Sequence, residues 1–350
     1  LFEGFWGCRK SAETVECAMA NFLQLNSIAL TTKIRMNWTS LRPVSTFVLA
    51  CFVGAAVLGC HRPPKEPETT ITTTEACQPG KRTVPVLRLG ATPFGSSNVM
   101  LSGYQGIADY VEQVTGIPVE LVAIDDYADM TAQLKSQQLE IALLPPLEYL
   151  AAKELMPCLQ PSLTTVQDGQ TKYTGYLVVR CDSGIDDVRQ LNGGKLGLVS
   201  KNSASGDLFP RVRLLADGIN ADLDMEQVVY FGSHLAVIEA VLSKTIDVGA
   251  TFDAGLEIAR REGLDTKALS ILAITGRIPL EAVVIHPDLD PAIIDKVERA
   301  FATLNNSTHT GRTALGPLGT VVGYARSNDA FYDTVRETLK AYQQLSGGAQ

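Results

Sequence analysis

Short apolar runs alternate with amphipathic segments through most of the chain after Val86. In the amphipathic segments, apolar residues recur every three or four positions, which is the period of a helix buried on one side. Near-continuous apolar runs that are joined through helices are typical of parallel strands covered on both faces. The predicted strands are 86–91, 119–124, 141–145, 195–200, 228–232, 247–251, 269–274 and 282–286. The pattern predicts an α/β fold.

The alternation occurs in two blocks, at about 86–155 and 195–251, which predicts two lobes, each a mostly parallel sheet flanked by helices. Between the blocks, the runs 158–166 and 172–180 flank a polar turn and predict an antiparallel pair that carries the chain into the second lobe. The run 269–286 is expected to carry it back.

We therefore assign 85–175 and 275–350 to lobe 1 and 176–274 to lobe 2. Because the chain crosses twice between them, a ligand cleft between the lobes is expected.

The segment before this pattern predicts targeting rather than folding. Residues 44–59 form an uncharged apolar run that ends at Cys60, and a polar stretch rich in Pro and Thr follows. This order resembles a bacterial lipoprotein signal at 36–59, with a lipidated Cys60 and a flexible tether over 60–84. Residues 1–35 are interpreted as an upstream extension. The prediction places the protein on the periplasmic or cell-surface face of a bacterial membrane, and the alternative is an uncleaved membrane anchor.

Composition narrows the class of function. The 350 residues carry a formal net charge of -8, which disfavours a nucleic-acid partner. Seven cysteines without a C-x-x-C pair do not predict a zinc module or a dense disulfide scaffold. No metal site or cofactor is predicted from these patterns.

Small polar residues follow the predicted strand 195–200. Ser203, Ala204, Ser205 and Gly206 lead into a helix, where hydroxyl groups and free backbone N–H groups can hold an anion. The alternative is an ordinary helix cap. His234 follows the next predicted strand, and its ring N–H can donate to the same anion, or the imidazole can simply be a buried or capping group.

These motifs together resemble the phosphonate-binding periplasmic component of ABC transporters. The matching segments, in chain order, are 126–127, 145–152, 173–183, 202–210, 231–242, 247–250 and 278–281. The resemblance implies a two-lobed type II periplasmic binding protein fold that captures a phosphonate, phosphite or phosphate for an ABC transporter permease, with no catalysis.

The resemblance also implies roles for individual residues. Ser203, Ala204 and Ser205 match the loop that holds the phosphonate oxygens, and His234 matches an oxyanion-binding histidine. Tyr127 and Tyr173 match two tyrosines that face the ligand.

Two acidic positions bear on the class of ligand. Glu281 matches a carboxylate that meets the ammonium group of an aminoalkyl phosphonate, and the second such position falls at Asp253 or at Ala254. Asp253 can also be a helix cap. A smaller ligand such as phosphite, phosphate or methylphosphonate is the other possibility.

Two further expectations concern crosslinking and rival functions. The predicted pair 158–166 and 172–180 would bring Cys158 near Cys181, so a disulfide between them is expected in an exported compartment. A receptor that senses the same ligand for a membrane kinase is the main functional alternative. An enzyme on the same scaffold is disfavoured because no G-x-S-x-G or H-E-x-x-H motif occurs.

Overall fold

The computed structural model describes residue 77 and residues 80–91, 97–124 and 127–347. The predicted extension 1–35, the signal peptide 36–59, Cys60 and most of the tether lie outside this part of the chain. No helix of the described ranges is both long and apolar enough to cross a membrane.

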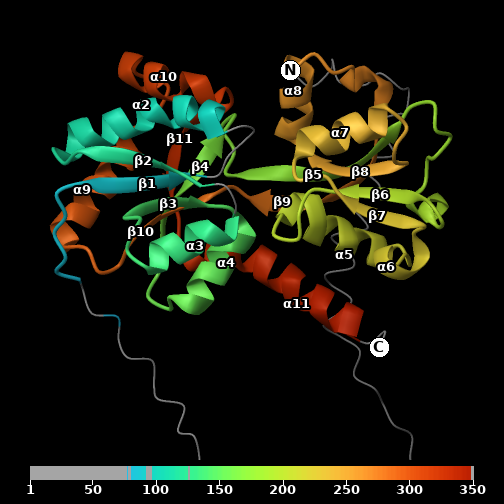
Figure 1. The fold of residues 1–350 in the computed structure, drawn as a ribbon, viewed down its shortest axis with the longest axis horizontal. Helices are drawn as coiled ribbons and strands as arrows, with labels where there is room; N and C mark the ends of the chain where they lie inside the picture. The colour runs from blue at the N-terminus through green and yellow to red at the C-terminus, as the bar shows by residue number, and fades with distance from the viewer. Residues whose placement is uncertain (1–76, 78–79, 92–96, 125–126, 348–350) are drawn as a thin grey trace, which may run out of the picture. The chain divides into compact units, whose positions relative to one another are not determined.

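The first sheet has six strands in the order β11-β4-β10-β3-β1-β2 (Figure 1). Strand β1 is parallel to both β2 and β3, whereas β10 pairs antiparallel with β3 and β4, and β11 pairs antiparallel with β4. The sheet is therefore mixed, and its parallel part is the block predicted at 86–155. The strands are β1 (Leu87–Ala91), β2 (Val119–Ala123), β3 (Ile141–Leu144), β4 (Pro161–Gln167), β10 (Ala282–Ile285) and β11 (Val321–Arg326).

Helices cover both faces of this sheet because successive strand side chains point to opposite sides. In β3, Ile141 and Leu143 join the core formed with α2, α9 and α10, whereas Ala142 and Leu144 join the core formed with α3, α4 and α11. The helices are α2 (Ser97–Thr115), α3 (Tyr127–Lys135), α4 (Pro146–Leu155), α9 (Pro291–Thr303), α10 (His309–Leu315) and α11 (Asp333–Gly347).

The second sheet has five strands in the order β7-β6-β8-β5-β9. Strands β6, β7 and β8 are parallel to one another in their pairings, and β5 is antiparallel to β8 and β9. The strands are β5 (Lys172–Arg180), β6 (Lys195–Leu198), β7 (Gln227–Tyr230), β8 (Val248–Phe252) and β9 (Leu269–Pro279).

One face of the second sheet packs against α5 (Phe209–Ala216) and α6 (Ala221–Asp224), and the other packs against α7 (His234–Leu242) and α8 (Asp253–Arg261). Short turns at Val188–Leu191, Ala204–Leu208, Thr266–Ala268, Gly316–Leu318 and Asp329–Tyr332 complete the described elements. All eight predicted strands are present, and the predicted two-sheet α/β fold is confirmed; β11 was not predicted. Both sheets are mixed instead of mostly parallel, because the strands by which the chain passes from one sheet to the other pair antiparallel with their neighbours.

The predicted antiparallel pairing of 158–166 with 172–180 is wrong. Both segments are strands, but β4 pairs with β10 and β11 in the first sheet, and β5 pairs with β8 and β9 in the second. Only the isolated bridge between Gln167 and Gln170 closes the turn that joins them. The chain therefore changes sheet at this turn.

The predicted Cys158–Cys181 disulfide is wrong for the same reason. Cys158 is bonded to Cys77, with a Cα–Cα distance of 5.5 Å and a sequence separation of 81 residues. Cys181 follows the far end of β5, where its backbone N–H donates to the Ala268 carbonyl at 2.8 Å. Because β4 and β5 lie in different sheets, no strand register brings Cys158 opposite Cys181.

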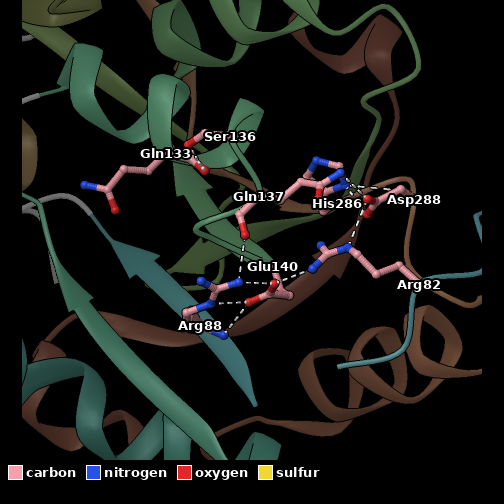
Figure 2. A network of polar contacts seen from close by, with 8 residues as sticks. All are labelled: Arg82, Arg88, Gln133, Ser136, Gln137, Glu140, His286 and Asp288. Atoms are coloured by element: carbon pink, nitrogen blue, oxygen red, sulfur yellow. Dashed lines mark hydrogen bonds and ion pairs between the residues drawn. The ribbon is translucent and has the colours of Figure 1, made fainter. Parts of the chain in front are cut away.

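A buried carboxylate fixes the start of the first sheet (Figure 2). Glu140, whose side chain is 0% exposed, accepts hydrogen bonds from Arg82 at 2.8 Å and from the Arg88 guanidinium at 2.6 and 2.9 Å. Asp288 accepts from Arg82 at 2.9 Å and also contacts His286. Together with the Cys77 disulfide, this network attaches the segment that enters the fold to the first sheet.

Candidate functional site

The loop after β6 forms the first part of the candidate site. Ser203 has an extended backbone, and its Oγ accepts a hydrogen bond from the Gly206 N–H at 3.0 Å, so Ser203 caps the π-helical turn Ala204–Leu208 that precedes α5. A serine hydroxyl that accepts one bond still has its hydrogen to donate. The cap and a role toward an anion are therefore compatible.

Close packing explains the small residues in this loop. A Cβ atom on Gly206 would lie 2.5 Å from Cβ of Val199, so only glycine fits there without displacing Val199, the residue that follows β6. Ala204 and Ser205 are buried, at 4% and 3% exposed. The loop therefore presents backbone N–H groups and the hydroxyl groups of the buried Ser203 and Ser205 instead of bulky side chains.

The second strand-to-helix junction lies next to the first. Strands β6 and β7 are parallel, and the backbone N–H of Phe231 donates to Leu198 at 2.9 Å, which aligns the ends of the two strands. Ser233 caps α7 by accepting from the Ala236 N–H at 3.2 Å, and His234 is the first residue of the helix. The carboxyl ends of parallel strands are where α/β proteins usually bind ligands.

Three side chains converge at this edge. Oγ of Ser205 lies 3.5 Å from Nε2 of His234 and 3.4 Å from the Tyr173 hydroxyl. Both distances are at the outer limit of a hydrogen bond, so neither contact holds the hydroxyl strongly. The three groups are neutral donors that can turn toward a shared anion.

Phe252 orients two of these three groups and was not predicted. Its ring meets the His234 ring at a centroid distance of 4.7 Å and the Tyr173 ring at 5.2 Å, both edge to face. A phenylalanine at the end of a buried strand carries no sequence signal that separates it from ordinary core.

Burial controls the charge of His234. It lowers the pKa of His234 to about 4, against a smaller opposing effect of the Ala250 backbone carbonyl. The imidazole is therefore neutral at neutral pH and acts through hydrogen bonding instead of charge. None of the four residues that form the site carries a positive charge at neutral pH; they are Ser203, Ser205, Tyr173 and His234.

Asp253 connects α8 to β5. Its two carboxylate oxygens accept from the backbone N–H groups of Thr174, at 2.9 Å, and Ala254, at 2.8 Å. Burial raises the pKa of Asp253, and these two N–H donors oppose that rise. Both oxygens are thus engaged by backbone N–H groups, although Asp253 is the first residue of α8 and the N-cap position is Phe252, so the helix-cap interpretation of Asp253 is wrong.

The remaining predicted residues, Glu281 and Tyr127, lie in segments that adjoin strands of the first sheet. Glu281 lies in the two-residue link between β9 and β10, and Tyr127 is the first residue of α3. The side chain of Tyr127 lies outside the described part of the structure, and so does its neighbour Asp126.

Thr275 is a second residue that sequence reasoning missed. It is 6% exposed, and its hydroxyl has no hydrogen-bond partner among the described residues. A Cβ on Gly175 would lie 2.4 Å from Oγ1 of Thr275 and 3.7 Å from Cβ of Ser205, so the two hydroxyl residues flank Gly175. A single threonine inside an apolar strand gives no motif that could reveal this.

A cavity of about 230 Å³ lies elsewhere, between α5, α6 and the end of α11. Arg211 lines it, but its guanidinium is bonded to Asp207 at 2.8 Å, to Asp222 at 2.9 Å and to Tyr230 at 3.1 Å. Because two carboxylates already match this charge, the cavity offers an anion little attraction. We therefore centre the site on Ser205.

Two α/β sheets in one chain, with polar groups converging at the strand ends, are typical of a solute-binding protein. The family model described as "ABC transporter, phosphonate, periplasmic substrate-binding protein" matches residues 89–332. The chain therefore belongs to the family of periplasmic substrate-binding proteins of ABC phosphonate transporters, and these are binding proteins, not enzymes.

One relative agrees with this assignment. The chain is 24% identical over 227 residues to the phosphate-import protein PhnD of Mycolicibacterium smegmatis, covering 62% of this chain and 71% of that protein.

Two solved structures share the fold. A binding protein component of an ABC phosphonate transporter from Pseudomonas aeruginosa has a TM-score of 0.68 at 20% identity, covering 76% of this chain and 89% of that one. PhnD1 from Prochlorococcus marinus, in complex with methylphosphonate, has a TM-score of 0.65 at 17% identity, covering 73% and 98%.

Proposed function

We propose that this protein captures a small phosphorus oxyanion, namely a phosphonate, phosphite or phosphate, and delivers it to an ABC transporter permease. The observation that carries the proposal is the convergence of Tyr173 and His234 on Ser205 at the ends of β6 and β7. Hydroxyl, imidazole and backbone N–H donors recognise tetrahedral oxyanions, and the preceding loop supplies N–H groups at the start of a helical turn.

The relatives support this class of ligand. One is described as a phosphate-import protein, and the structure of another contains methylphosphonate. In our proposal, the hydroxyl groups of Ser203 and Ser205 and the N–H groups of Ala204 and Ser205 bind the oxyanion from the second sheet, and His234 donates from the adjacent junction. Tyr127 and Tyr173 complete the site.

A ligand screen tests the proposal. A ligand that binds only the folded protein must raise its melting temperature, and at 100 times Kd the stabilisation is about 2.7 kcal/mol. The full-length protein is tested with phosphate, phosphite, methylphosphonate and aminoethylphosphonate, with acetate as the control anion. At least one phosphorus ligand should raise the melting temperature well above acetate; no shift with any of them contradicts the proposal.

We further propose that a lipid on Cys60 attaches the protein to the membrane. The apolar run 44–59, Gly59 and the Pro- and Thr-rich stretch that follows support this proposal. Replacing Cys60 with Ser should move the protein into the soluble fraction and abolish the mass increase of the modified residue. A Cys60→Ser variant that stays membrane-bound with unchanged mass contradicts the proposal.

A further inference from the structure

Glu281 lies beside the carboxyl ends of the parallel strands in the first sheet. The proposed site lies at the carboxyl ends of the parallel strands in the second sheet. Ala282 in β10 is paired antiparallel with Leu144, the last residue of β3, so Glu281 stands beside the carboxyl end of a parallel strand. Three residues earlier, Ile278 is the register partner of Tyr173. The link from β9 to β10 thus connects Glu281 directly to the strand pair that carries part of the proposed site.

Hydroxyl groups, not cations, surround the Glu281 side chain. Thr165 and Tyr324 are 4% and 8% exposed; the Thr165 hydroxyl lies beside the Glu281 carboxyl group, and the Tyr324 hydroxyl has no hydrogen-bond partner in the described part of the chain. Burial raises the pKa of Tyr104, of Tyr324 and of Tyr332, and in each case the nearby Glu281 charge adds to the rise. These groups come from α2, β4, β11 and the turn before α11, the elements packed around Glu281.

In these surroundings, the carboxyl group of Glu281 is more stable when it shares a proton with a hydrogen-bond partner than when it is fully ionised. Burial raises its pKa, and only its own backbone and Thr165 oppose the rise, so no arginine or lysine among the described residues stabilises the ionised form. A carboxylate without a cation in such surroundings gains from a hydrogen bond that donates to it.

The oxyanion side of the proposed site also favours a ligand of low charge. Ser203, Ser205 and Tyr173 are neutral, and burial lowers the pKa of His234 to about 4. A dianion would meet neutral donors and the Glu281 carboxylate, with no positive side chain from these residues in compensation. A monoanion that keeps one P–OH group removes one negative charge and brings the hydrogen that Glu281 lacks.

Ammonium recognition is less well supported. A ligand ammonium group would need carboxylates that are free to turn toward it, whereas both oxygens of Asp253 are bonded to the N–H groups of Thr174 and Ala254. Glu281 is then a single carboxyl group surrounded by hydroxyl groups. These surroundings favour a proton shared with the ligand over an ion pair with a ligand ammonium group.

We propose that Glu281 selects the protonation state of the ligand: one proton is shared between its carboxyl group and an oxygen of a phosphorus oxyanion, and anions that cannot bring or take up this proton are rejected. The inference rests on the proposed function. The Thr165 hydroxyl orients the carboxyl group, and fully ionised tetrahedral anions such as sulfate are excluded by repulsion.

Calorimetry on the full-length protein across pH tests the idea with phosphite and methylphosphonate, whose second pKa values differ. Above the second pKa of each ligand, its affinity should fall by about tenfold per pH unit, because the required proton becomes scarce. The two midpoints should therefore differ as the two ligand pKa values do. The inference is overturned if the affinities of both ligands fall with the same midpoint pH, or if neither affinity falls. This test uses the wild-type protein alone.

Glu281→Gln provides the second arm, since an amide can donate to a dianion. The variant should bind methylphosphonate with a flattened pH profile and should bind sulfate at least about tenfold more tightly than the wild type. Glu337→Gln, an exposed position on α11, is the matched control and should keep the wild-type profile. Wild-type protein that binds no phosphorus ligand at any pH contradicts the proposed function itself, whereas binding with a pH profile unaffected by Glu281→Gln contradicts only this inference.

Discussion

Oγ of Ser205 lies 3.5 Å from Nε2 of His234, although the two residues are 29 positions apart and belong to different strand-to-helix junctions. The parallel pairing of β6 with β7 creates this proximity, because it aligns the carboxyl ends of the two strands. The proposed site therefore has two hydrogen-bond donors from different parts of the chain, and each can be removed by a separate substitution.

Removing either donor should weaken oxyanion binding. A hydrogen bond to a charged partner contributes about 1.5–3 kcal/mol, so Ser205→Ala and His234→Ala should each lower affinity by roughly ten- to a hundredfold. Calorimetry with the best ligand of the screen measures this. Ser136→Ala, whose hydroxyl bonds its own helix at 2.9 Å, is the control and should bind normally. Wild-type affinity in both site variants would rule out Ser205 and His234 as ligand contacts.

The imidazole of His234 should remain neutral through the physiological pH range. Its pKa is about 4 in the folded protein, where burial lowers it from 6.5. The unfolded chain binds the proton more tightly, so this residue's contribution to stability is fully present above pH 6.5 and is lost as the pH falls toward 4. The NMR resonance of the ring, assigned by its loss in His234→Asn, should not shift between pH 5.5 and 8. A titration midpoint near 6.5 would contradict the prediction.

Glu140 should be essential for the stability of the first sheet. Burial alone would raise its pKa, but hydrogen bonds from Arg88 and Arg82 outweigh this effect and lower the pKa. Glu140→Gln leaves Arg88 without its carboxylate and Arg82 with Asp288, at a cost of about 3 kcal/mol, the low end for a buried pair because water reaches both arginines.

The cost should depend on pH with a definite sign. The ionised carboxylate stabilises the fold above its unfolded pKa of 4.5, and this contribution is lost as the pH falls through the lowered native value. Urea denaturation should therefore show a larger difference between wild type and variant at pH 7 than at pH 3. A constant difference would mean that the charge is not responsible.

The Cys77–Cys158 disulfide should be detectable as a specific crosslink. Digestion without reduction should release a peptide pair that joins these two cysteines and none that joins Cys158 to Cys181. Because the bond closes a loop of 81 residues, replacing both Cys77 and Cys158 with Ser should cost roughly 2–5 kcal/mol and lower the melting temperature. A double variant with the wild-type melting temperature would show that the bond does not contribute to stability.

Sequence periodicity was sufficient for the elements themselves. Strands β1, β2 and β3 and the parallel strands of the second sheet were predicted because a buried strand needs apolar residues at every position, and this requirement is local. The Ser203–Gly206 loop and His234 were candidates for a similar reason: small polar residues directly after a strand reflect the local geometry of a strand-to-helix junction.

The sequence by itself determined the α/β class, the positions of the strands and the residue types at the candidate site. Only the tertiary structure decided that β4 and β5 belong to different sheets, that Cys158 is bonded to Cys77, and that Asp253 is occupied by two backbone N–H groups. Strand pairing and disulfide partners depend on contacts between residues far apart in the chain, and two strands adjacent in sequence carry no local signal of which sheet each will join. Phe252 and Thr275 escaped notice for the same reason, since a buried aromatic ring or hydroxyl becomes part of a site only when the fold brings a neighbour such as Ser205 or His234 beside it.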